Sequence, residues 1–311
     1  MRQAFVRALC EEARKNPKIF LITGDLGFRI LEPFIEEFPK RFLNVGVAES
    51  NLVTVAAGLS TTGFTPFIYS IATFVSMRPF EQIRDDVCLQ NRNVKIVAIG
   101  AGLAYAKAGP THHSMEDIAL MRALPNMTIV NPSDTNECYQ ATKQIAKLKG
   151  PAYLRIERNP DDVQIPLTRP DFELGKGQVI KEGGKIAILT TGTKIPKALL
   201  VSGALAEMKI SSAVFSFPTI MPLDEDLLLK IAGEYPTIVT CEEHRVSGGF
   251  GSAVAEFISS PKNPNFNKII RVGLKNSFST ISGEYDRLLA HHAFTPKHIV
   301  KSLLSEIGRK G

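Results

Sequence analysis

The run VKIVAIGAG, residues 94–102, decides the fold class. Its β-branched and small apolar residues are typical of a strand that a parallel sheet buries on both faces. Strand-like runs also occur at 19–25 (IFLITGD), 42–48 (FLNVGVA) and 64–72 (FTPFIYSIA), and stretches with helical periodicity separate them. Strands that alternate with helices predict a mostly parallel α/β sheet.

The same alternation begins again after residue 177, with strands such as KIAILTTGT (185–193) and TIVTCEEH (237–244). The intervening segment loses its periodicity and is rich in proline and acidic residues, as linkers are. A chain of 311 residues is long enough for two cores. We therefore expect two α/β domains with mostly parallel sheets flanked by helices, at 1–165 and 177–311, joined by a linker at 166–176.

Composition excludes several classes of protein. With 44% hydrophobic and 22% charged residues the chain is expected to be soluble and globular, with no membrane span and no signal peptide, so cytoplasm is the default compartment. The four cysteines are far apart and form no CxxC, which disfavours a zinc cluster. The net charge of +6 is spread along the chain, which argues against nucleic acid and suits phosphorylated metabolites or an acidic partner subunit.

Several motifs have a structural and a functional interpretation. Gly100-x-Gly102 follows a strand, but Tyr105 stands where a dinucleotide-binding turn needs its third glycine. In CEEHRVSGGFGSAV (241–254), a cysteine and a histidine do not make a metal site, and the glycines are expected to form a tight strand-to-helix turn. We therefore predict neither a nicotinamide site nor a metal site.

Histidine and arginine supply the candidate ligand-binding groups. His112 and His113 follow a Gly-Pro turn, where α/β sheets bind anions, although a solvated loop is an equal alternative. Arg155 and Arg158 end the last strand of the first domain, and either could bind phosphate or form a structural ion pair, for example with Glu157.

Glu49 in NVGVAESN (44–51) has apolar sequence on both sides and no basic residue within that stretch. A helix dipole stabilises a first-turn carboxylate by only some tenths of a kcal/mol. Burial without a partner costs several kcal/mol. Glu49 is therefore expected either to be exposed or to meet a group from outside the chain.

Four segments in this order resemble the transketolase family, which includes transketolase and 1-deoxyxylulose-5-phosphate synthase. They are FLNVGVAESN (42–51), AAGLSTTGFTPFIYSIATFVSMRPFEQIRDDV (56–87), AGPTHHSMEDIALMRALPNMTIVNPSD (108–134) and CEEHRVSGGFGSAV (241–254). The resemblance covers only the family's pyrimidine-binding and C-terminal domains. It implies a split enzyme whose N-terminal subunit holds Mg²⁺ and the diphosphate of thiamine diphosphate through a GDG…Asn motif. An α₂β₂ assembly is the implied stoichiometry.

The resemblance also implies roles for individual residues. Glu49 matches the glutamate that hydrogen-bonds N1′ of the cofactor's aminopyrimidine, and Phe74 matches an aromatic that packs near that ring. Asp25 and Leu26, in GDLG (24–27), match a segment that approaches the thiazolium. His112 matches a histidine that contacts the donor sugar and its oxyanion. Arg158 matches a phosphate-binding arginine, and we expect His113 and Arg158 to help hold an anionic substrate.

Three positions depart from the family pattern. Ile71 replaces the aromatic that stacks on the pyrimidine, while Ala108 and Gly100 replace an acid and a histidine that contact substrate. Lost polar groups change which substrate hydroxyls a site can recognise. The resemblance implies transfer of a two-carbon ketol unit between a ketose and an aldose. The alternatives are the chemistry of deoxyxylulose phosphate synthase or of a 2-oxoacid dehydrogenase β-subunit, and a non-catalytic partner subunit.

Overall fold

The predicted strand at 94–102 is β4 (Lys95–Ala101), near the middle of the first of two sheets. The structure is a computed structural model that describes residues 1–157 and 171–308. The first sheet has the order β10-β5-β6-β4-β3-β1-β2, and within the described residues only β10 runs antiparallel to its neighbour. Its other strands are β1 (Ile19–Thr23), β2 (Phe42–Asn44), β3 (Thr65–Ile71), β5 (Thr128–Val130), β6 (Ala152–Glu157) and β10 (Thr219–Met221).

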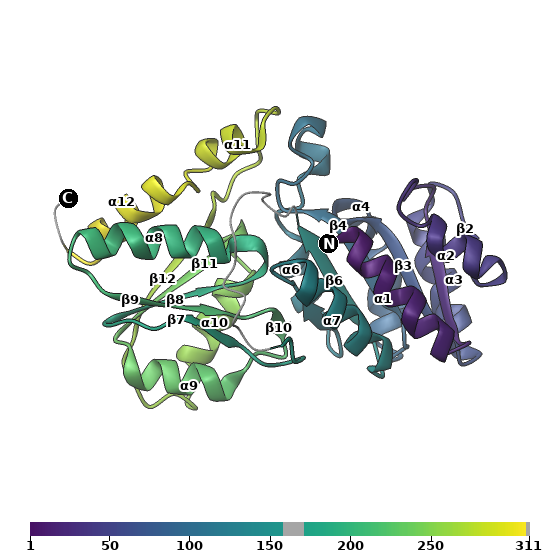
Figure 1. Ribbon diagram of the computed structural model, residues 1–311, viewed down its shortest axis with the longest axis horizontal. Coiled ribbons are helices and arrows are strands. Elements are labelled where there is room, and N and C mark those ends of the chain that lie inside the picture. The colour runs from purple at the N-terminus through teal and green to yellow at the C-terminus, as the bar shows by residue number, and fades with distance from the viewer. Residues whose placement is uncertain (158–170, 309–311) are drawn as a thin grey trace.

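Helices cover both faces of this sheet, as Figure 1 shows for α1 and α7 in front of it. Apolar residues of α1, α2 and α7 form one core with the sheet, and those of α3, α4 and α6 contribute to another. The helices are α1 (Arg2–Lys15), α2 (Glu32–Glu37), α3 (Glu49–Thr61), α4 (Ala72–Met77), α5 (Phe80–Gln82), α6 (Asp117–Arg122) and α7 (Thr135–Lys147). Asp134 caps α7 by accepting a hydrogen bond from the Glu137 N–H at 2.8 Å.

The second sheet has the order β12-β11-β8-β9-β7, with β7 antiparallel to β9. In Figure 1 the helix α8 lies on one side of this sheet and α9 on the other. The strands are β7 (Gln178–Lys181), β8 (Ile186–Thr190), β9 (Ser212–Ser216), β11 (Thr237–Arg245) and β12 (Lys268–Leu274). The helices are α8 (Ile195–Glu207), α9 (Glu225–Glu234), α10 (Phe250–Ile258), α11 (Tyr285–His291) and α12 (Pro296–Glu306).

The predicted fold class is confirmed, and the differences are local. The helical stretch after α4 is irregular, because the short α5 is followed by a π-helical segment at Ile83–Cys88. The helix after β2, α3, begins at Glu49, so this carboxylate lies in the first helical turn. Within the described residues no helix is both long and apolar enough to cross a membrane.

Parallel strands place their carboxyl ends at one edge of the sheet, where α/β proteins bind ligands. At this edge β1 leads to Asp25, and β3 ends at Ile71 ahead of α4. The strand β4 leads into the segment that carries His112 and His113. These candidate residues predicted from sequence therefore follow neighbouring strands at a common edge.

Candidate active site

Glu49 is buried, with 4% of its surface exposed, and its partner lies within the chain. Arg78 directly follows α4 and donates a hydrogen bond from Nη1 to Glu49 Oε2 at 2.9 Å. Both alternatives expected from the sequence were therefore incomplete, because Glu49 is neither exposed nor dependent on another chain for a partner. Arg78 is half-exposed, so one side of this ion pair faces solvent.

Arg78 also joins Glu49 to an aromatic group. Its guanidinium carbon lies 4.2 Å from the centroid of the Phe74 ring, a cation–π arrangement. The ring of Phe74 meets the imidazole of His112 edge-on, with centroids 5.0 Å apart. Glu49, Arg78, Phe74 and His112 thus form a continuous row of side chains from α3, α4 and the loop after β4. The structure brings together three of the residues predicted from sequence and adds Arg78.

The two histidines of the loop differ sharply. His112 is partly exposed, and its Nδ1 lies 3.0 Å from Thr111 Oγ1. His113 is buried, and its Nε2 lies 3.2 Å from the carbonyl oxygen of Ala106. Burial lowers the pKa of His113, which favours the neutral imidazole. A solvated loop is therefore the wrong description of His113.

Asp25 and Leu26 occupy the turn after β1. Asp25 has a left-handed backbone, with φ 58°, and its backbone N–H donates to Asn44 Oδ1 at 2.9 Å. The Asn44 side chain in turn donates to Asp25 Oδ1 at 3.1 Å. Leu26 and Ile71 both pack against the same apolar core, so they form the hydrophobic border of the edge. Among the described residues no group of three or more His, Cys, Asp or Glu side chains could hold a metal ion.

Gly100 has no space for a side chain. A Cβ at this position, where φ is +71°, would lie 1.9 Å from the ring of Tyr105. Tyr105 also lies beside His112, with ring centroids 6.1 Å apart. Tyr105 is therefore a neighbour of the candidate site, which its place in the sequence does not indicate.

Arg155 and Arg158 are the two arginines predicted from the sequence as candidate phosphate ligands. Arg155 is fully buried and pairs with Asp117 at 2.8 Å and with Glu157. Arg155 therefore forms structural ion pairs, which was one of the two alternatives expected from the sequence. Arg158 lies outside the described residues.

The glycines after β11 form the expected turn into α10. Buried Glu242 accepts hydrogen bonds from the N–H groups of Phe250 and Gly251, both at 2.7 Å. A Cβ on Gly249 would lie 2.2 Å from Glu242 Oε2, so the close approach requires glycine. The glycines of this motif therefore have the structural role that the sequence predicts, because they form the turn into α10.

The arrangement is a pyrimidine-binding α/β domain followed by a second α/β domain of the kind found at the C-terminus of transketolases. Residues 1–160 match the family of transketolase pyrimidine-binding domains, and residues 175–299 match the transketolase C-terminal domain. The chain therefore belongs to the transketolase family.

Similar proteins include separate subunits. The chain is 37% identical to a protein of Methanocaldococcus jannaschii named for a transketolase C-terminal section, covering 100% of this chain and 97% of that one. It is 35% identical to a 6-deoxy-6-sulfo-D-fructose transketolase subunit of Clostridium sp., covering 100% and 95%. A solved structure described as a split-gene transketolase, an inactive β₄ tetramer, superposes with a TM-score of 0.88 at 36% identity, covering 100% and 99%.

Proposed function

We propose that this chain is the pyrimidine-domain subunit of a two-chain, thiamine-diphosphate-dependent transketolase that moves a two-carbon ketol unit from a ketose to an aldose. The observation that carries the proposal is the buried carboxylate of Glu49 beside Phe74 and His112 at the carboxyl edge of the sheet. Relatives of the same length that are named as transketolase subunits support it.

The residues at this edge fit the aminopyrimidine half of the cofactor. Glu49 offers an oxygen to a ring nitrogen, and Phe74, Leu26 and Ile71 offer aromatic and aliphatic surface to the ring. Ile71 gives apolar contact without aromatic stacking. When bound, the cofactor supplies the electron sink for carbon–carbon bond cleavage. A partner subunit would hold Mg²⁺ and the diphosphate.

His112 is the residue best placed to bind the donor sugar. It is partly exposed next to Phe74, so its imidazole can reach a substrate oxygen and stabilise developing negative charge there. His113 is buried, so it would act on substrate only in a conformation of the loop that exposes its ring. Arg158 would help to bind an anionic acceptor, so we propose phosphorylated or otherwise anionic sugars as substrates.

A decarboxylating reaction is the second candidate, because 1-deoxy-D-xylulose-5-phosphate synthase of Syntrophus aciditrophicus is 37% identical over 280 residues. That match covers 89% of this chain and 42% of the synthase. Gly100, whose place is filled by Tyr105, favours a donor other than the ordinary pentose phosphates.

Reconstitution tests the proposal. The chain would be mixed with the N-terminal subunit, thiamine diphosphate and Mg²⁺ and assayed with a panel of ketose phosphates and sulfonates, and separately for CO₂ release from pyruvate. We expect ketol transfer, which Glu49→Gln lowers by about 100-fold or more. Glu225→Gln is the control, because Glu225 is also a first-turn carboxylate in an ion pair, with Lys262 at 2.6 Å, but lies on α9.

Pyruvate-dependent CO₂ release would mean that the enzyme catalyses the decarboxylating reaction and not transketolation. Thermal stabilisation of the two-chain complex by the cofactor without any turnover would indicate a non-catalytic subunit. Undiminished transfer by Glu49→Gln would refute the role given to Glu49.

A further inference from the structure

The loop that carries His112 and His113 is closed at its base. Gly102 and Ser114 form an isolated antiparallel bridge, in which each backbone N–H donates to the other residue's carbonyl at 2.9 Å. Residues 103–113 therefore form a loop whose ends meet directly after β4. The loop belongs to the first domain by sequence, but its contacts reach into the second.

Both ends of the loop are held by the end of β11. The carboxylate of Glu243 accepts a hydrogen bond from the Leu103 N–H at 2.8 Å, and the Arg245 N–H donates to the Met115 carbonyl at 3.0 Å. A Cβ on Gly102 would lie 2.4 Å from Glu243 Oε1, so only glycine permits this approach. The second domain thus holds the loop at its entry and at its exit.

Apolar packing also attaches the loop to the second domain. Leu103, Ala106 and Met115 are buried in a hydrophobic cluster whose other buried members all come from the second domain, among them residues of β8, β9, β11, β12, α8, α11 and α12. The Gly283 N–H donates to the carbonyl of Ala106 at 3.3 Å. The base of the loop is therefore built into the core of the second domain.

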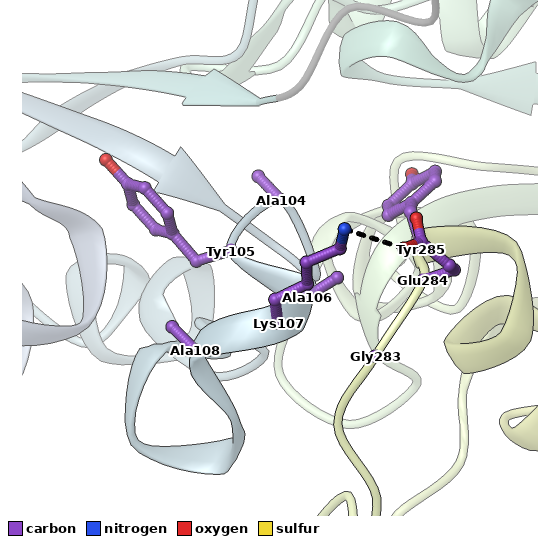
Figure 2. Close-up of a pocket in the computed structure, with 8 residues that line it drawn as sticks. All are labelled: Ala104, Tyr105, Ala106, Lys107, Ala108, Gly283, Glu284 and Tyr285. Carbon is purple, nitrogen blue, oxygen red and sulfur yellow. Dashed lines mark ion pairs between the residues drawn. The ribbon is translucent and has the colours of Figure 1, made fainter.

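The surface side of the loop faces the second domain across a cavity of about 290 Å³. Figure 2 shows Lys107 reaching Glu284, an ion pair of 2.7 Å between exposed side chains. Tyr105 points to the other side, away from Glu284. This exposed pair adds little stability, so the buried contacts of Glu243 dominate the anchoring.

Glu243 is 1% exposed, and its charge is compensated inside the protein. Its second oxygen accepts hydrogen bonds from Lys194 and Tyr285. Lys194 also lies 3.4 Å from Glu157 at the end of β6. Burial would lower the pKa of Lys194, but Glu243 raises it above its ordinary value, which keeps the lysine charged.

We propose that Glu243 is a positioning residue for the substrate site: from the second domain it fixes the loop that presents His112 and His113. The second domain reaches His113 through the loop, since the Nε2 of His113 lies 3.2 Å from the carbonyl oxygen of Ala106, and Ala106 is itself held by the second domain. The importance of His112 for substrate rests on the proposed function, whereas the anchoring of the loop does not.

Hydrogen–deuterium exchange of the isolated chain tests the anchoring. The Leu103 amide is expected to be strongly protected in the wild-type chain and to exchange about tenfold faster or more in Glu243→Ala. Glu243→Gln keeps an acceptor oxygen and should retain most of the protection. Glu256→Ala is the control, because Glu256 also makes an ion pair between the domains, with Arg122 at 2.6 Å, but does not contact the loop.

If Glu243→Ala fails to fold, the wild-type chain in increasing urea decides the matter. The Leu103 amide should lose its protection at the same urea concentration as the amides of β11. The proposal would be overturned if Leu103 lost protection together with the first domain alone, or if it exchanged rapidly without urea. Unchanged exchange in a folded Glu243→Ala would also overturn it.

Kinetics of the two-chain enzyme separate positioning from stability. Glu243→Ala should lower kcat/KM for the sugar by about tenfold while leaving cofactor affinity unchanged, and it should have little further effect when combined with His112→Ala. Additive losses would overturn the positioning role. A protected loop together with full activity of His112→Ala would refute the role given to His112, and a protected loop in a two-chain complex without ketol transfer would refute the proposed function. Both results would leave the anchoring intact.

Discussion

Arg78 donates to the carboxylate of Glu49 at 2.9 Å, so the acid proposed to meet the cofactor already has a partner within the chain. The same guanidinium covers the ring of Phe74. An arginine that donates to a carboxylate holds one of its oxygens in place. A cofactor nitrogen that approaches this same oxygen would therefore compete with Arg78 for Glu49.

A double-mutant cycle in the isolated chain should detect this ion pair. Arg78→Gln is expected to lower the free energy of unfolding by about 1 kcal/mol, since it removes the partner of a buried carboxylate from a half-exposed pair. In a Glu49→Gln background the same change should cost much less. Urea unfolding provides the measurement, and Arg14→Gln, which breaks an exposed pair with Glu37, is the control. Additive effects would mean that the two side chains are not coupled.

Arg78→Gln should also change cofactor binding by the two-chain complex. If Glu49 must exchange Arg78 for the aminopyrimidine, removing Arg78 should lower the Kd for thiamine diphosphate by about threefold to tenfold, equivalent to about 1 kcal/mol. Isothermal titration calorimetry with Mg²⁺ present measures this directly. Weaker binding would instead make Arg78 part of the cofactor site. Absence of binding by the wild-type complex would contradict the proposed function itself.

The fold was predictable because the apolar strands are strictly local signals. The run at 94–102 becomes β4, and its neighbours β3 and β6 are also almost entirely buried. The strand β10 was not predicted, because three residues, Thr219–Met221, carry little pattern and pair with β5 of the other domain. Pairing between segments so distant in sequence depends on the tertiary structure.

The site was predictable as a set of residues but not as a set of contacts. Glu49, Phe74 and His112 do lie near one another, whereas Arg78 was missed because it is 29 residues from Glu49. Its position four residues after Phe74, one helical turn on, was the available signal. The contact of Glu243 with Leu103 spans 140 residues, and no local pattern indicates it.

Stability should fall as the pH is lowered, because of His244. The Ala119 N–H donates to His244 Nε2 at 3.3 Å, so the ring proton is on Nδ1, which donates to the Arg245 carbonyl at 2.8 Å. Protonation of Nε2 would set two N–H groups against each other. Burial lowers the pKa of His244 to about 4, against an ordinary value of 6.5.

The neutral form of His244 is therefore favoured in the folded state. Its contribution is fully present above about pH 6.5 and is lost as the pH falls towards 4, by roughly 3 kcal/mol. His292, with a pKa lowered to about 4, acts in the same direction, whereas burial raises the pKa of Glu242 to about 7, so its contribution is lost as pH rises. Urea midpoints between pH 4.5 and 7.5 should show a flatter profile for His244→Gln than for wild type or His298→Gln. An unchanged slope would contradict this assignment.

Two glycine substitutions test whether the turn after β11 is structural. Gly249→Ala should destabilise the chain by about 2 kcal/mol or more, because its Cβ would lie 2.2 Å from Glu242 Oε2 and 2.6 Å from His244 Nδ1, both buried. Gly203→Ala is the matched control, since Gly203 lies within α8 with no atom within 4 Å of the added Cβ. It should stabilise the chain by about 0.5–1 kcal/mol through helix propensity. Thermal or urea unfolding measures the change in stability of both variants. Equal changes would mean that the turn tolerates a side chain and that Glu242 does not depend on its close approach to Gly249.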